Sequence, residues 1–182
     1  NIRFSIWNKN EFKKVNTIEN YRHAIVGYLA QDIYYRRIKE LNDLNQSAFR
    51  DSFIYEDQIS DLDMYYLFSA SLSQNSILQG IEDALTLAEQ IKRYGFLESE
   101  FDLAKKRHLD HLNQALIEEN TRSSEDFIDE YINHFIYEEM ITGLAKEIEY
   151  TEEMFKSISV EDLNDYFKNY LSSNNRIISI VA

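Results

Sequence analysis

The fold is decided by residues 49–72, which read FRDSFIYED, QISD and LDMYYLFSASL in succession. Residues 62–72 alternate in the manner of a strand, with Ser69 and Ser71 on one side. The other side carries Met64, Tyr66, Phe68, Ala70 and Leu72. Residues 49–57 are rich in aromatic side chains, and the polar stretch 58–61 is typical of a turn. The pattern predicts an antiparallel pair of strands joined by a hairpin.

Two more strands are expected near the ends of the chain. Residues 2–7 alternate apolar with polar side chains until Trp7, and residues 176–181 form a mostly apolar run after Asn174 and Asn175. We expect both segments to join the central hairpin in one sheet.

The remaining segments have helical periodicity. The expected helices cover residues 16–41, 76–94, 99–119, 124–139 and 144–157, and a last helix follows Ser159. Gly95 is placed to end the second helix, and the short link to the third predicts that these two pack antiparallel.

Helix starts are predicted from polar side chains that can accept a hydrogen bond from a free backbone N–H. The expected caps are Asn16 with Glu19, Ser76 with Gln79, Ser99 with Asp102, and Ser159. The buried stripe of the first helix is expected to contain Ile18, Tyr21, Ile25, Tyr28, Leu29 and Ile33.

The order of elements predicts an α+β protein, with an antiparallel sheet packed against several helices. Strands are not interleaved one-for-one with helices, which argues against a parallel α/β sheet. Residues 1–182 show no internal repeat and no linker-like stretch, so we expect a single domain.

Composition excludes several function classes. The chain has no cysteine, so disulfides, thiolate metal ligands and a cysteine nucleophile are excluded. Its four glycines are too scattered for a phosphate-binding loop. The net charge of −13 opposes nucleic acid and anionic membrane surfaces, and no apolar run approaches the roughly 20 residues of a membrane span. We therefore expect neither nucleic acid nor a membrane as a partner.

The histidines suggest one candidate metal site. His108 and His111 lie three residues apart on an expected helix, with Glu118 seven further on, and histidines at this spacing can share zinc. The alternative is that His108 packs on the apolar face and His111 lies at its rim. Zinc needs at least a third ligand, so we favour packing. His23 is interpreted as a surface residue, and His134 is given no role.

No other residue set identifies a catalytic centre. The serines match no nucleophile motif, and the carboxylates are too numerous for any pair to stand out. The acidic residues at 118–119 and 147–153 are interpreted as solvated helix surface. The 13 tyrosines include the pairs at 34–35 and 65–66, which place phenols on both faces of their elements and suit interfaces as well as cores. No catalytic, cofactor-binding or metal residue is assigned.

Several segments of the sequence resemble segments of one protein family. They are residues 21–29 with 36–41, residues 96–105 after Gly95, residues 131–135, and residues 158–164 with the closing 175–178. In this order they resemble a non-catalytic domain of the M16 (insulinase/pitrilysin-type) zinc peptidases, in a bacterial member. The resemblance covers nearly the whole chain.

The resemblance implies the α+β fold of that family, whose domains assemble around an enclosed chamber. It implies that the zinc motif H-x-x-E-H lies outside this chain, which has no such motif, and that zinc belongs to the full-length protein. The chain starts at Asn1, and we expect it to be part of a longer polypeptide. The implied partners are other domains or a homologous subunit and a peptide substrate, and the implied location is the periplasm or cell envelope.

Three functions stay open at this point. The first is a non-catalytic domain that helps to enclose the chamber of a metallopeptidase and contacts peptide. The second is a peptide-binding or scaffold protein of the same fold without peptidase activity. The third is a self-contained metal site at His108 and His111.

Overall fold

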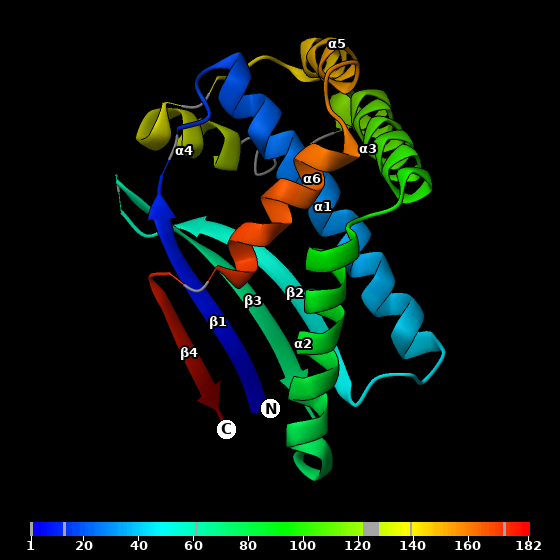
Figure 1. The fold of residues 1–182 in the computed structure, drawn as a ribbon. Coiled ribbons are helices and arrows are strands. Elements are labelled where there is room, and N and C mark those ends of the chain that lie inside the picture. Colours follow the sequence, from blue (N-terminus) through cyan, green and yellow to red (C-terminus); the bar gives the residue numbers. More distant parts are fainter. Residues whose placement is uncertain (1, 13, 61, 122–127, 139, 173) are drawn as a thin grey trace.

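The structure, a computed structural model, describes residues 2–12, 14–60, 62–121, 128–138, 140–172 and 174–182. Four antiparallel strands form one sheet in the order β2-β3-β1-β4 (Figure 1). They are β1 (Ile2–Glu11), β2 (Phe49–Gln58), β3 (Asp63–Leu72) and β4 (Arg176–Val181). The predicted hairpin is confirmed, and both outer segments join it, so the α+β fold class is also confirmed.

The register of the strands places the alternating apolar side chains on one face. Phe68 of β3 lies opposite Ile6 of β1 and Ile54 of β2, and all three side chains are buried. Ser69 lies opposite Ser5 on the other face, where their hydroxyl oxygens are 3.1 Å apart. A strand shows each face every second residue, so one register fixes both faces at once.

The helices gather mainly on one side of the sheet (Figure 1). They are α1 (Ile18–Asp43), α2 (Ile77–Tyr94), α3 (Glu98–Glu118), α4 (Ile128–Tyr137), α5 (Leu144–Phe155) and α6 (Val160–Lys168). Helices α1 and α2 pack on the sheet and α6 packs on both of them, while α3 packs on α1 and α5. A short 3-10 turn, Asn169–Leu171, follows α6 and contacts β1 and β3.

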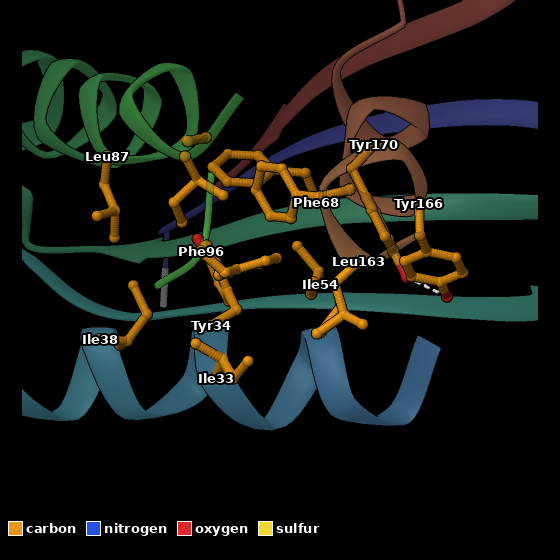
Figure 2. Packing of buried hydrophobic residues seen from close by; sticks show 14 of the residues in the cluster. Ile33, Tyr34, Ile38, Ile54, Phe68, Leu87, Phe96, Leu163, Tyr166 and Tyr170 are labelled. Carbon is orange, nitrogen blue, oxygen red and sulfur yellow. Dashed lines mark hydrogen bonds between the residues drawn. The ribbon is translucent and has the colours of Figure 1, made fainter. Parts of the chain in front are cut away.

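The core lies between the sheet and these helices (Figure 2). Phe68 is fully buried, and its ring centroid is 6.4 Å from that of Tyr34 on α1. The Tyr34 hydroxyl lies 2.6 Å from the Ser52 hydroxyl on β2, so the buried phenol is not left without a partner. Full burial of one such side chain contributes about 2 kcal/mol, which makes this aromatic layer a main source of stability.

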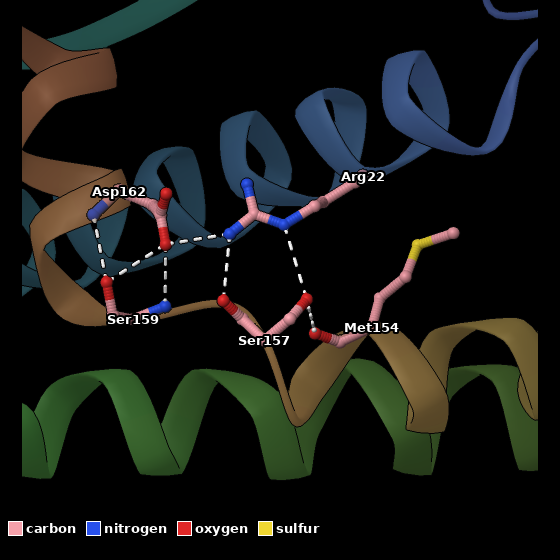
Figure 3. Close-up of polar contacts among 5 residues, drawn as sticks. All are labelled: Arg22, Met154, Ser157, Ser159 and Asp162. Carbon is pink, nitrogen blue, oxygen red and sulfur yellow. Dashed lines mark hydrogen bonds and ion pairs between the residues drawn. The ribbon is translucent and has the colours of Figure 1, made fainter.

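Arg22 fastens α1 to the link between α5 and α6 (Figure 3). Its Nη2 donates to the Ser157 carbonyl oxygen and to Asp162 Oδ2, each at 2.9 Å. Asp162 Oδ2 also accepts from the Ser159 backbone N–H at 2.8 Å, while Ser159 Oγ accepts from the Asp162 backbone N–H. The predicted Ser159 cap is confirmed, and α6 begins with a reciprocal capping box.

The cap predicted for α1 is wrong. Thr17, and not Asn16, precedes the helix, and its hydroxyl oxygen accepts from the Asn20 backbone N–H at 3.2 Å. The expected buried stripe is also partly wrong, because Ile18 and Tyr28 are 61% and 44% exposed. The first turn of the helix is exposed, and its buried side begins in the second turn, at Ile25.

The caps predicted for α2 and α3 are wrong as well. Ser76 makes no capping bond, because its hydroxyl donates to the Ala48 carbonyl oxygen at 3.2 Å. Helix α3 begins after Leu97 instead of at Ser99, and the Leu97 backbone N–H donates to Glu100 Oε2 at 2.7 Å. At α2 the serine hydroxyl is thus engaged by a distant segment, whereas at α3 a neighbouring glutamate makes the capping contact.

Antiparallel packing of α2 and α3 is a further prediction that fails, because each helix packs on other elements. Gly95 does end α2, and its φ of 77° is readily adopted only by glycine. Ser124 and Glu139, the predicted limits of the next helix, lie outside the described residues. No helix in the described part of the chain is long and apolar enough to cross a membrane.

Candidate binding site at the end of the sheet

A cavity of about 470 Å³ lies where β1 and β2 end and β3 begins. Glu11, Glu56 and Tyr66 line it from these strands, and His23 of α1 and Asn133 of α4 line it from the helices. Figure 1 shows β1 pointing toward α4 and β2 ending beside the end of β1. Segments far apart in the sequence therefore meet at this end of the sheet.

The walls of the cavity combine apolar surface with oxygen-bearing side chains. Phe12, Val15, Ala24 and Met64 supply apolar surface. Carboxylates come from Glu11, Glu56 and Asp57, and amides come from asparagines and Gln58. Among the residues described as lining it there is no lysine or arginine. An apolar wall with a few convergent polar groups is typical of a binding site.

A row of polar side chains crosses the sheet beside the cavity. Tyr66 of β3 lies opposite Asn8 of β1 and opposite Glu56 of β2. These positions share the helix-covered face with Phe68, where apolar side chains would be the ordinary choice. Asn8 is 1% exposed and Tyr66 is 5% exposed, so the row is a buried polar feature within the core.

Two tyrosines cover this row. Tyr166 lies in α6, and Tyr170 lies in the turn that follows it. The Tyr166 and Tyr170 hydroxyls lie 3.0 Å apart (Figure 2). The Tyr66 ring packs edge-on against both rings. Tyr166 also hydrogen-bonds to Glu56. Desolvation raises the pKa of each of these phenols, so all three stay protonated and act as neutral hydrogen-bonding groups.

Glu56 is the most unusual member of the row. Its Oε2 atom is shielded from solvent and has no hydrogen-bond partner. Desolvation raises the pKa of this carboxyl above its usual range, and the hydrogen bond from Tyr166 offsets only part of that effect. Asn8 has a comparable defect: its Nδ2 donates to the Tyr170 carbonyl oxygen at 2.8 Å, but its buried Oδ1 accepts nothing. The row thus contains two acceptors that lack donors.

His108 is a packing residue, as the sequence favoured. Its ring lies 4.4 Å from the Tyr28 ring and 6.1 Å from the Phe155 ring, measured between centroids, and both ring nitrogens lack partners. Desolvation lowers the pKa of His108 to about 4, so the ring is neutral at pH 7. In the described part of the chain, no three histidine or carboxylate side chains are grouped to hold a metal.

The other predicted positions are dispersed. His111 and Glu118 are exposed on α3, and His134 is exposed in the last turn of α4. His23 is exposed, as expected, but it also lines the cavity, and its Nε2 lies 3.5 Å from the Tyr66 hydroxyl. The tyrosine pairs behave as predicted: Tyr34 and Tyr66 are buried, while Tyr35 is 58% exposed.

Sequence reasoning missed Glu56, Asn8 and Tyr166 as site residues. Glu56 lies in a strand where many carboxylates look alike, and Asn8 follows the end of the recognised alternation at Trp7. The sequence does contain a signal, because Asn8 and Glu56 continue the alternation on the face that carries Ile6, Ile54 and Phe68.

Comparison with known proteins connects this fold to zinc peptidases. No protein-family profile matches the sequence. An Arabidopsis thaliana protein described as zinc protease PQQL-like is 25% identical over 87 residues, which is 48% of this chain. The chain spans only 9% of the length of that relative.

The solved structures match over the whole chain. The periplasmic protease PqqL from Escherichia coli superposes with a TM-score of 0.90 at 11% identity, covering 100% of this chain and 20% of PqqL. A structure of the first half of PqqL superposes with a TM-score of 0.91 at 10% identity. This match covers 98% of this chain and 38% of that structure. The inactive peptidase domain of a putative zinc protease from Bordetella parapertussis superposes with a TM-score of 0.61 at 12% identity. The match covers 99% of this chain and 89% of that domain.

These matches establish the class of fold. The chain has the fold of one domain of the M16-type zinc proteases, and the resemblance indicated by the sequence is confirmed. At these identities the likeness concerns the fold and not the chemistry. The chain spans about one fifth of PqqL, so the activity of a whole protease does not follow from it.

Proposed function

We propose that this chain is a non-catalytic domain of an M16-type zinc metallopeptidase, which helps to enclose the peptidase chamber and contacts the peptide substrate. The observation that carries the proposal is that the whole chain superposes on one fifth of a protease while its sequence has no H-x-x-E-H motif. The match to the first half of PqqL and to an inactive peptidase domain supports the same role.

The features of the cavity agree with contact to a substrate rather than with catalysis. The Tyr66 phenol that lines it is held protonated, and its lining offers carboxylates and amides on apolar walls. Such a surface can hold a peptide side chain, but it presents no activated nucleophile. Zinc would be supplied by another domain of the same polypeptide or by a homologous subunit.

The test is to express the complete open reading frame that contains residues 1–182, and separately the chain alone. Zinc content and cleavage of an unstructured peptide, with and without a chelator, are then measured for both. We expect stoichiometric zinc and chelator-sensitive cleavage in the complete product, and neither in the chain alone.

Two results would contradict the proposal. A complete product that lacks zinc and cleaves nothing would favour a peptide-binding or scaffold protein of the same fold. Stoichiometric zinc in the chain alone, lost in a His108→Ala/His111→Ala variant, would instead establish the local metal site that the sequence left open.

A further inference from the structure

The two edges of the sheet differ in how they are protected against pairing with another strand. In the order β2-β3-β1-β4, the edge strands are β2 and β4 (Figure 1). The strand β2 contains Arg50, Asp51, Glu56 and Asp57, its ladder with β3 is irregular between residues 49 and 51, and α1 and α2 pack on it. Charged side chains, a bulge and a covering helix are the means by which natural edge strands avoid such pairing.

The other edge strand, β4, lacks this protection in the described part of the chain. Residues 176–181 read RIISIV, with a single charge at Arg176 and an unbroken register against β1. The strand packs on β1, and no described helix packs on it to a comparable extent. A mostly aliphatic strand is typical of a position with neighbours on every side and not of an open edge.

Isoleucines of β4 are exposed on both faces of the sheet. Ile178 lies opposite the buried Ile6 on the helix-covered face, yet it is 53% exposed. Ile180 is on the same face and is 58% exposed. Ile177 lies opposite Trp7 on the other face and is 69% exposed. The cover that the helices give to β1 therefore stops short of β4.

The backbone of β4 also has an unpaired side. The Lys9 backbone N–H donates to the Asn175 carbonyl oxygen at 3.1 Å, which fixes the phase of the ladder between β1 and β4. In an antiparallel ladder, residues that bond to the partner strand alternate with residues whose N–H and C=O groups point away from it. Ile177 therefore bonds to β1, whereas the backbone groups of Ile178 and Ile180 point outward from the sheet.

We propose that an extended segment from another part of the same polypeptide pairs with β4 and adds a further strand to this edge of the sheet. That segment is expected to be apolar on both of its faces, because the exposed isoleucines of β4 lie on both faces. The inference rests on the proposed function in taking the chain to be one domain of a longer protein.

A second copy of this chain fits the edge less well. The six residues of β4 span about 20 Å, and one strand adds about 5 Å of width. Pairing along β4 alone therefore covers far less than the roughly 800 Å² per partner of a standard interface. Two copies also repel each other, since each has a net charge of −13. A segment of the same polypeptide avoids both problems, because its tether keeps it at a high effective concentration.

The test is hydrogen–deuterium exchange of the complete open-reading-frame product, resolved to single residues by mass spectrometry. We expect the Ile178 and Ile180 amides to exchange as slowly as the Ile177 amide, about a hundredfold or more slower than an unpaired edge amide. The outward-facing amides of β2 supply that reference within the same molecule. In residues 1–182 alone, the Ile178 and Ile180 amides are expected to exchange fast while the Ile177 amide stays protected.

Two substitutions locate the protection. Ile178→Lys places a charge at the paired edge, so in the complete product the Ile180 amide should return to fast exchange. Tyr55→Lys places the same charge on β2, where the side chain is 46% exposed, and should leave the exchange of β4 unchanged. Equal effects of the two substitutions on β4 would contradict a strand paired at this edge.

Three further results would overturn the proposal. Fast exchange at Ile178 and Ile180 in the complete product would show that the edge is open. Their protection in residues 1–182 alone, with a dimer in sedimentation, would assign the edge to a second copy. Protection that appears only after an unstructured peptide is added would assign it to a ligand. Zinc content and cleavage are measured separately, so the added strand can fail while the peptidase proposal stands, and the reverse also holds.

Discussion

Gly27 of α1 lies directly against the ring of Tyr166 from α6. A Cβ atom built at Gly27 would lie 2.6 Å from the Tyr166 hydroxyl oxygen and 2.8 Å from Cζ, closer than van der Waals contact allows. Glycine in the middle of a helix costs about 1 kcal/mol relative to alanine. Here that cost is offset because the absent side chain lets Tyr166 reach Glu56 and Tyr170.

Gly27→Ala is therefore expected to destabilise the protein despite its higher helix propensity. Overpacking a buried contact costs about 1–3 kcal/mol, against the gain of about 1 kcal/mol in the helix. Because Tyr166 is 3% exposed, its ring has little room to move away. Urea unfolding should show a net loss of about 1 kcal/mol, and an unchanged or higher midpoint would contradict the close approach. Gly143→Ala is a poor control because its φ of 74° is strained for alanine.

Glu56→Gln is expected to stabilise the protein at pH 7. The pKa of Glu56 is raised in the folded state by desolvation, so between the unfolded and folded pKa values the folded state holds the proton more tightly. The free energy of unfolding contributed by Glu56 therefore falls as pH rises through that window. Glutamine cannot ionise, so the variant should gain about 1 kcal/mol over the original protein at pH 7.

This gain should shrink toward zero or reverse at pH values below the unfolded pKa of Glu56. Thermal unfolding at several pH values measures it, with Glu152→Gln as the matched control. If Glu56→Gln were destabilising at pH 7, the carboxylate would have a favourable partner in the folded state, and the description of Glu56 Oε2 as a buried acceptor without a donor would be wrong.

The contacts of Arg22 and Asp162 predict which of two substitutions destabilises the protein more. Asp162→Ala removes both the ion pair with Arg22 and the capping contacts with Ser159, so it should cost about 2 kcal/mol. Arg22→Ala leaves the cap in place and should cost about 1 kcal/mol. Chemical unfolding of both variants and of the double variant gives the coupling energy. A larger loss for Arg22→Ala than for Asp162→Ala would contradict this geometry.

His108 predicts a loss of stability in acid. Desolvation lowers its folded pKa to about 4, below the unfolded value of about 6.5. The unfolded state therefore binds a proton first, and the free energy of unfolding falls as pH drops from about 6.5 to about 4. The fall is on the order of 3 kcal/mol if the histidine acts alone.

His108→Phe is expected to remove most of that dependence, because phenylalanine keeps the ring contacts with Tyr28 and Phe155 and does not titrate. His111→Gln removes a neighbouring charge that also lowers the His108 pKa, so it should reduce the pH dependence without removing it. Identical profiles for His108→Phe and the original protein would show that His108 is not the group responsible.

Local pattern was sufficient for the elements of the fold. The alternation at 62–72, the hairpin between the two strands and the Ser159 cap depend on side chains a few residues apart, and each is confirmed. The same local reasoning failed at Ser76 and Ser99, where distant groups or a neighbouring glutamate took over the bonding. It failed also for the packing of α2 and α3, which depends on the space beside α1 and α5 and not on the length of the link.

The sequence by itself determined an α+β chain with an antiparallel sheet, an acidic surface and no zinc motif, because period, charge and motif spacing are properties of the chain. Only the tertiary structure decided where the candidate site lies. Asn8, Glu56 and Tyr66 are separated by up to 58 residues and meet because the strand register aligns them. Tyr166 reaches them across a helix because residue 27 has no side chain, and pairwise contacts of this kind leave no periodic trace in a sequence.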